Sequence, residues 1–133
     1  YIQQAQRRYQ GRFEVADVRS YQPPAGEFYD FILLNSFLHH IDDQNTSKIL
    51  ANMDSLLSDD GHVHILELVL PERASVSRWL ARHDRGKFPR SLERWKQIFS
   101  DQFETVTLKP FPLALCGITL WNMVYFKGRR KDG

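Results

Sequence analysis

The sequence predicts an α/β fold in which a mostly parallel sheet ends in an antiparallel edge pair. Residues 29–34 and 62–70 are near-continuous apolar runs, typical of strands that are buried on both faces. An amphipathic helical stretch separates them, and strand, helix and strand in this order imply a right-handed parallel crossover. Two more apolar segments, 103–109 and 118–126, close the chain at a spacing that suits an antiparallel return.

Length and composition agree with a single globular domain. The chain has 133 residues, of which 42% are hydrophobic and 26% charged. Its apolar runs are far shorter than the roughly 20 residues that cross a bilayer, and no basic-then-apolar leader opens it, so we expect no membrane contact and no secretion. One cysteine cannot form an internal disulfide, which favours a reducing compartment, most simply the cytoplasm. Tyr1 in place of Met predicts a fragment or a processed product.

The first half of the chain contains a helix, two strands and a second helix. Residues 1–10 have helical spacing and Gly11 follows as a stop, while residues 13–17 alternate like a short strand. The run at 29–34 is expected to be a central parallel strand. The next helix begins at the N-cap candidates Asp42 and Asp43 and ends at 59–61. Its apolar positions are Ile49, Leu50, Met53, Leu56 and Leu57.

The second half of the chain adds a strand, a helix and the edge pair. Residues 62–70 form a buried strand that Pro71 closes. A helix begins at Ser91 and carries an apolar stripe at positions 92, 95, 98 and 99. The last two strands are joined by a loop over 110–117, which contains two prolines, Cys116 and Gly117.

Charge is strongly segregated along the chain, although the net charge is only +2. Residues 21–69 hold eight acidic side chains against one basic, whereas residues 70–96 hold eight basic against three acidic. The basic stretch is consistent with a solvated helix face, with an anionic substrate, or with nucleic acid. A basic tail at 127–131 adds to the last possibility, but no zinc-finger or RNA-recognition signature accompanies it, so nucleic acid is not favoured and not excluded.

Polar residues follow the apolar strands, at the edge of an open α/β sheet where ligands bind. They are Asp17 after the first strand, Asn35, Ser36, His39 and His40 after the second, and Glu67 near the end of the third. Each of the first five has a structural alternative, as a turn cap, a loop start or a donor at a helix entrance. A carboxylate buried without a partner is costly, so the last of them favours a functional role. Carboxylate and imidazole together predict an acid/base site.

Two other groups of residues carry weaker chemistry. His62 and His64 share one face of a strand, which is compatible with a metal ligand pair. At about 3.3 Å per residue, however, they lie about 10 to 16 Å from the strand end where His39 is expected, so we expect no metal site. Cys116 has no cationic or histidine neighbour in the sequence that would activate it as a nucleophile.

Three segments in order resemble the C-terminal part of a class I S-adenosylmethionine-dependent methyltransferase. They are Asp17, residues 35–43 (NSFLHHIDD) and residues 56–71 (LLSDDGHVHILELVLP). The resemblance covers nearly all of the chain and implies a Rossmann-like sheet in the strand order 3-2-1-4-5-7-6. The first two strands of that fold are lacking here, and they would lie between the strands at 13–17 and 29–34. No G-x-G-x-G loop occurs in the chain, so the resemblance places that loop upstream of Tyr1.

The same resemblance implies roles for the polar residues and S-adenosyl-L-methionine as cofactor. Asp17, with Val18 beside it, would contact the adenine, and Asn35 and Ser36 would line the methionine moiety. In the small-molecule O-methyltransferases of this family a histidine removes the acceptor's proton and a glutamate orients that histidine. These roles fall on His39 and Glu67.

The chain departs from that subgroup at two positions, and the acceptor side rests on analogy. His40 stands where the subgroup usually has Asp, and it remains a candidate for the same task. Asn35 stands where the subgroup often has Lys. Residues 72–90 would lie over a small-molecule acceptor, and Arg82, Arg85 and Arg90 would bind an acidic one.

Two other functions remain open at this point. A non-catalytic module that binds a partner protein would keep the fold without the cofactor loop, as would a pseudoenzyme. An RNA-modifying methyltransferase would explain the basic stretch and the tail, and its RNA binding would depend steeply on salt. The sequence leaves open the acceptor, the atom methylated and the oligomeric state.

Overall fold

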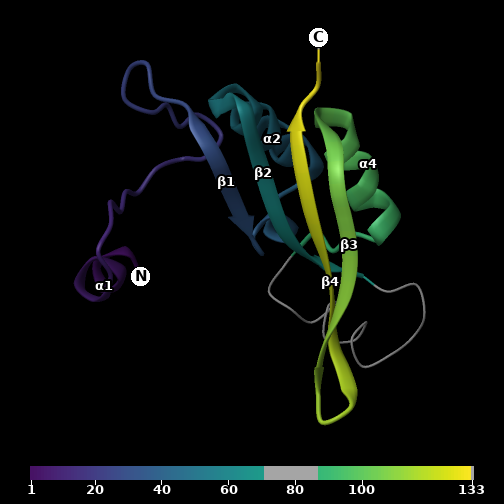
Figure 1. Ribbon diagram of the computed structural model, residues 1–133. Helices are drawn as coiled ribbons and strands as arrows, with labels where there is room; N and C mark the ends of the chain where they lie inside the picture. The colour runs from purple at the N-terminus through teal and green to yellow at the C-terminus, as the bar shows by residue number, and fades with distance from the viewer. Residues whose placement is uncertain (71–86, 133) are drawn as a thin grey trace.

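The computed structural model describes residues 1–70 and 87–132, and this part forms one four-stranded sheet with two helices on one face (Figure 1). The strand order is β1-β2-β4-β3. β1 runs parallel to β2, and β4 runs antiparallel to both of its neighbours. The elements are α1 (Ile2–Arg8), β1 (Tyr29–Asn35), η1 (Leu38–His40), α2 (Asp43–Leu56), β2 (Leu57–Val69), α4 (Leu92–Gln102), β3 (Phe103–Leu115) and β4 (Ile118–Arg130). The predicted fold class is confirmed.

Helix α2 begins where its cap predicts and ends earlier than expected. The Asp42 side chain accepts a hydrogen bond from the backbone N–H of Asn45 at 2.7 Å, which satisfies one of the open donors of the first turn. The helix ends at Leu56, and β2 starts at once because Leu57 is fully buried and pairs with Tyr29. The predicted stop at 59–61 is therefore wrong, since these residues lie inside β2.

Helix α4 matches its prediction. The Ser91 hydroxyl accepts a hydrogen bond from the N–H of Arg94 at 3.2 Å and caps the helix. The apolar stripe is buried against the sheet and continues into the core that α2 shares. The fully buried core side chains include Leu38, Ile49, Leu50, Leu57, Val63, Ile65, Trp95, Phe99, Phe103, Val124 and Phe126.

Strand β1 has the predicted position but a different environment. Among the described residues it pairs with β2 alone, so it is an edge strand and not a central one. Leu34 faces the core, whereas Phe31 is 60% and Leu33 49% exposed on the opposite face. An apolar run predicts a strand from its composition, but burial on both faces depends on what packs against each face. The expectation of a strand covered on both sides is corrected here.

The segment before β1 differs from the prediction as well. Residues 13–17 form no strand, because within the described chain no neighbouring strand offers them hydrogen-bond partners. The predicted opening helix is present as α1, which buries none of its side chains and lies away from the sheet (Figure 1).

The last two strands form a long hairpin with a short turn. Leu115 pairs with Ile118, so only Cys116 and Gly117 lie between the strands, and their φ angles of 51° and 77° suit a tight hairpin turn. The predicted loop over 110–117 is therefore too long. Pro110 and Pro112 lie within β3, where proline is tolerated because β3 is an edge strand.

No described helix is long and apolar enough to cross a membrane. Arg82 and Arg85 lie outside the described residues.

Candidate active site

Two of the polar residues predicted at the strand ends, His39 and Glu67, form a buried pair. Glu67 is fully buried on β2, and its Oε2 atom lies 2.8 Å from the Nδ1 atom of His39. Its Oε1 accepts a hydrogen bond from the backbone N–H of Leu38 at 2.6 Å, and the N–H of Leu68 donates to Oε2 at 3.1 Å. The carboxylate in the apolar strand thus has partners on both oxygens, which offsets the cost of its burial. The family resemblance implied these two residues as a base and the acid that orients it, and the structure brings the two side chains together.

The turn that carries His39 begins at the end of β1. Ser36 has a φ of 53°, a conformation that few side chains adopt, and its N–H donates to the carbonyl of Leu66 at 2.8 Å. The Ser36 hydroxyl donates to the Asn35 side chain at 3.1 Å, and Asn35 pairs with Leu66 in the sheet register. Asn35 and Ser36 therefore lie beside the strand segment that bears Glu67. Strained backbone of this kind concentrates at functional sites.

A cavity of about 410 Å³ lies beside the turn and includes His40 in its lining. It brings together Asp17, Val18 and His40, three of the predicted site residues, although the first two are more than twenty positions from the third. The remaining lining is Arg19, Ile41, Asp42, Asn45, Ile49 and Phe88. Its volume lies within the range of small-molecule sites, and its mix of apolar and polar groups is typical of them.

Asp17 is bonded to Arg19 in the lining of this cavity. The guanidinium lies 2.6 Å from the Asp17 carboxylate, and the N–H of Arg19 donates to the same carboxylate at 2.9 Å. These hydrogen bonds lower the pKa of Asp17 from 3.8 to about 2. Arg19 also donates to the Asn45 side chain at 3.2 Å, which connects the segment before β1 to helix α2. The partnership with Arg19 was missed, and only the Asp-x-Arg spacing signals it.

The two halves of the candidate site meet at the turn of residues 38–40. His39 packs its ring on that of His40, with the ring centroids 4.1 Å apart. His39 is buried against Glu67, whereas His40 is exposed and lines the cavity. The N–H of Phe88, a cavity residue, donates to the carbonyl of His39 at 3.0 Å. The two adjacent histidines therefore face different groups: the His39 ring contacts the buried Glu67 carboxylate, and the His40 ring lines the cavity.

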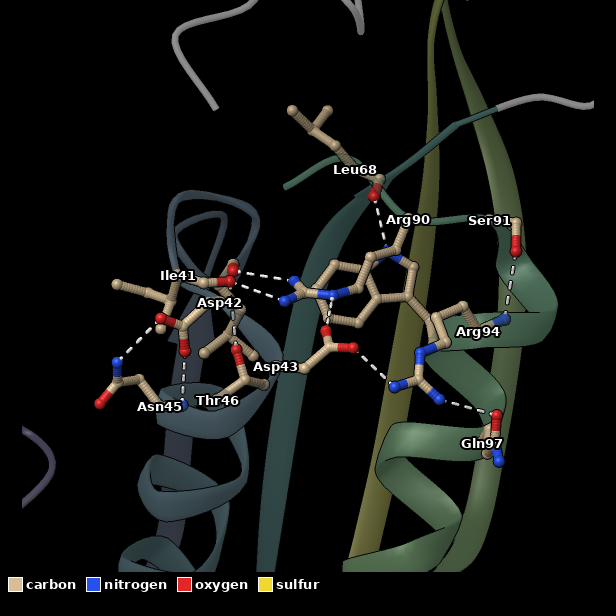
Figure 2. A network of polar contacts seen from close by, with 12 residues as sticks. Ile41, Asp42, Asp43, Asn45, Thr46, Leu68, Arg90, Ser91, Arg94 and Gln97 are labelled. Carbon is tan, nitrogen blue, oxygen red and sulfur yellow. Dashed lines mark hydrogen bonds and ion pairs between the residues drawn. The ribbon is translucent and has the colours of Figure 1, made fainter. Parts of the chain in front are cut away.

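A network around Arg90 was not predicted (Figure 2). By family analogy Arg90 was expected to bind an acidic acceptor. In the structure its side chain is only 5% exposed and bonds to Asp43 and to backbone carbonyls. Arg90 and Arg94 both bind Asp43, at 2.8 Å and 2.6 Å, and this lowers the pKa of Asp43 below its ordinary value. Nothing in the sequence near Arg90 signals Asp43 as its partner, because the two are 47 positions apart.

His64, of the second histidine pair, contacts two aromatic side chains. His64 lies 2.7 Å from the Tyr125 hydroxyl and stacks on Phe31 with the ring centroids 4.3 Å apart. Burial, followed by the charge of Lys127, lowers its pKa. In the part of the chain that the structure describes, no three His, Cys, Asp or Glu side chains gather as a metal site.

This fold, with the His39–Glu67 pair at the carboxyl ends of its two parallel strands, is Rossmann-like. The sequence matches the family described as Methyltransferase domain over residues 1–65. It is also 34% identical, over 97 residues, to the O-methyltransferase bik3 of Gibberella fujikuroi. The alignment covers 65% of this chain and 21% of that protein.

Solved structures share the fold. The structure of LepI in complex with SAH and a substrate analogue has a TM-score of 0.71 at 16% identity, over 97% of this chain and 34% of LepI. The N-methyltransferase NodS of Bradyrhizobium japonicum, in complex with S-adenosyl-L-homocysteine, has a TM-score of 0.67 at 15% identity, over 98% of this chain and 59% of NodS. The structure of LaPhzM has a TM-score of 0.63 at 26% identity, over 87% of this chain and 33% of LaPhzM.

The chain is thus similar in sequence to a methyltransferase domain over its first 65 residues, and it shares its fold with S-adenosylmethionine-dependent methyltransferases. The chain spans about a fifth of the curated relative that it matches and about a third of LepI.

Proposed function

We propose that this chain is part of an enzyme that transfers a methyl group from S-adenosyl-L-methionine to a small molecule, with His39 as general base. The observation that carries the proposal is the buried pair of His39 and Glu67, whose Nδ1 and Oε2 atoms lie 2.8 Å apart at the end of β2. The family and the O-methyltransferase relative support the same reaction class.

The cavity beside the turn fits one end of the cofactor. A carboxylate next to apolar surface suits an adenine, whose amino group donates hydrogen bonds and whose ring packs on aliphatic side chains. Asp17 supplies the carboxylate, and Val18 and Ile49 supply apolar surface. Asn35 and Ser36, at the end of β1, would hold the methionine end. Residues 1–133 contain no G-x-G-x-G loop, so the rest of the cofactor site is not supplied by a motif of this chain.

The cofactor supplies a methyl group on a positively charged sulfur. When bound, the cofactor would supply this methyl group to an acceptor oxygen, and the electron pair of the carbon–sulfur bond would stay on sulfur. His39 takes the acceptor's proton through the ring nitrogen that does not face Glu67. Glu67 holds the other nitrogen and stabilises the imidazolium that forms. Alignment of acceptor, methyl and sulfur supplies much of the rate.

Calorimetric titration of S-adenosylhomocysteine tests the cofactor assignment. We would titrate this chain and a version extended upstream of Tyr1 to the natural start of the polypeptide. Binding by the longer protein supports a cofactor site shared with that segment. Asp17→Ala should then weaken binding about tenfold, because a charge-assisted hydrogen bond is lost. Lack of binding by both proteins contradicts the proposal and favours a non-catalytic partner-binding module.

Methyl transfer to a panel of hydroxylated aromatic acceptors tests the base. His39→Gln and Glu67→Gln should each lower the rate of methyl transfer about 10²-fold or more, while the affinity for S-adenosylhomocysteine changes less than about twofold. His40→Gln is the matched control, because it alters the neighbouring imidazole and leaves the contact with Glu67. If His40→Gln abolishes transfer and His39→Gln does not, the roles of the two histidines are reversed.

A further inference from the structure

The side chain of Arg90 lies against the turn that carries His39 (Figure 2). Its Nη1 donates to the carbonyl of Leu38 at 3.0 Å, and its Nη2 donates to the carbonyl of Ile41 at 2.6 Å. These two residues bracket His39 and His40 on both sides. The turn therefore depends on a residue about fifty positions further along the chain.

Both backbone groups of Leu38, the residue before His39, are hydrogen-bonded to side chains of other segments. The N–H of Leu38 donates to Glu67 Oε1 at 2.6 Å, and the carbonyl of the same residue accepts from Arg90. The carbonyl of His39 accepts from the N–H of Phe88, which lies two residues before Arg90. With its flanking backbone groups bonded to other parts of the fold, the His39 ring has little freedom to move away from Glu67.

Arginine suits this position better than other cations. Its planar guanidinium directs several donors at fixed angles, so one side chain reaches two carbonyls and the Asp43 carboxylate together. Asp43 neutralises the buried charge, and the Trp95 ring lies 4.7 Å from the guanidinium carbon. The Trp95 indole in turn donates to the carbonyl of Leu68, next to Glu67. The same cluster therefore touches both the turn and the strand that bears the acid.

We propose that Arg90 is a positioning residue that holds the His39 imidazole on Glu67 and so keeps the proton of the ring on Nδ1. The inference rests on the proposed function, in which the other ring nitrogen receives the acceptor's proton. In this role Arg90 acts through the turn and does not touch the acceptor.

Nitrogen NMR of the histidine rings tests the proposal on the chain as it is. In the wild-type protein at neutral pH, His39 should show one tautomer with the proton on Nδ1. Arg90→Ala should move both ring nitrogen shifts toward the averaged values of a free histidine, and hydrogen exchange of the Leu38 amide should become at least about tenfold faster. Arg94→Ala is the matched control, because Arg94 binds the same Asp43 carboxylate and has no bond to the turn. It should leave both measurements unchanged.

Arg90→Lys is measured in addition, in case the alanine variant does not fold. A lysine keeps the charge, but its single ammonium group cannot reach both carbonyls and Asp43 together, so we expect the same averaging of the His39 shifts. Circular dichroism confirms that the variant is folded. Unchanged His39 shifts in a folded Arg90 variant overturn the proposal, as does an equal change in Arg94→Ala. The spectra need neither cofactor nor acceptor. The role of Arg90 is therefore tested independently of whether the chain takes part in methyl transfer.

Discussion

Glu67 is the residue for which sequence and structure agree most directly. A carboxylate in an apolar strand predicts a partner, because burial of an unpaired charge is costly. The structure supplies that partner as the His39 ring and, in addition, the N–H of Leu38, which the sequence does not indicate. Because Glu67 bonds both the His39 ring and the backbone of its turn, it also contributes to stability.

Removal of this carboxylate should therefore destabilise the fold. Glu67→Ala leaves a buried N–H and a buried imidazole without their acceptor, and we expect the free energy of unfolding to fall by about 3 kcal/mol. Glu67→Gln keeps one acceptor oxygen and should cost less. Urea denaturation measures both, with Glu27→Ala at an exposed position as control. Equal stability of Glu67→Ala and the wild type would contradict the role of Glu67 in holding the turn.

Asp17 provides a prediction about pH. Arg19 holds the pKa of Asp17 at about 2 through hydrogen bonds to both carboxylate oxygens. Arg19→Ala removes these bonds, so the pKa of Asp17 should rise toward 3.8, its ordinary value. Carbon NMR of the Asp17 carboxyl group measures the change. The titration runs from pH 1.5 to 6, which is about two units on either side of the ordinary pKa of 3.8. Arg12→Ala is the control, and a pKa of Asp17 that stays near 2 in Arg19→Ala is evidence against the pairing.

Asp43 links pH to stability. Arg94 and then Arg90 lower the pKa of Asp43, so the folded state binds this proton more weakly than the unfolded chain does. The contribution is present above about pH 4, and it is lost as the pH falls through the lower native pKa. The gap in melting temperature between wild type and Asp43→Asn should therefore be widest near pH 6 and narrow below pH 3. Thermal melts at three pH values measure it, and a gap that does not change with pH contradicts the ion pairs.

At the scale of elements, local signals predicted the helices well and the strand environments poorly. Asp42 and Ser91 cap α2 and α4 as their sequence positions indicate, because capping needs only a short segment. The segment at 13–17 has a strand pattern but forms no strand, because a strand needs a paired neighbour. The apolar run of β1 predicted a central strand, although in the described sheet β1 lies at the edge.

The hairpin offers a test of packing between its strands. Gly128 lies on β4 where an added Cβ would meet the Phe126 ring at 2.5 Å and the Phe103 Cβ at 2.9 Å. Gly128→Ala should lower the free energy of unfolding by about 1 to 3 kcal/mol, because both aromatic residues are fully buried in the core. Thr105→Ala, across the pair from Gly128 and exposed, should change it much less. Chemical denaturation measures the free energy of unfolding of both variants. Equal effects of the two substitutions would argue against close packing at Gly128.

At the scale of the whole molecule, stability is concentrated in one core between the sheet and helices α2 and α4. Phe99 is fully buried between the Trp95 and Phe126 rings, with centroid distances of 5.3 Å and 4.8 Å. Phe99→Ala should lower the free energy of unfolding by about 3 to 5 kcal/mol. Helix α1 buries no side chain, so deletion of residues 1–8 should shift the melting temperature by less than about 2 °C. A large loss of stability on that deletion would show that α1 packs on the fold.

Apolar periodicity, capping residues and the order of strand-end polar groups were enough to predict the α/β fold, the starts of helices α2 and α4, and polar residues at one edge of the sheet. These features are local, or they follow from the rule that the carboxyl ends of parallel strands share one edge. The pairing of His39 with Glu67 was implied by the resemblance to small-molecule O-methyltransferases. Tertiary structure alone decided that β1 is an edge strand, that Asp17 and His40 line the same cavity, and that Arg90 bonds the turn at His39. Each of these depends on contacts between segments far apart in the chain, and no local pattern of residues encodes which distant group will fill a hydrogen bond.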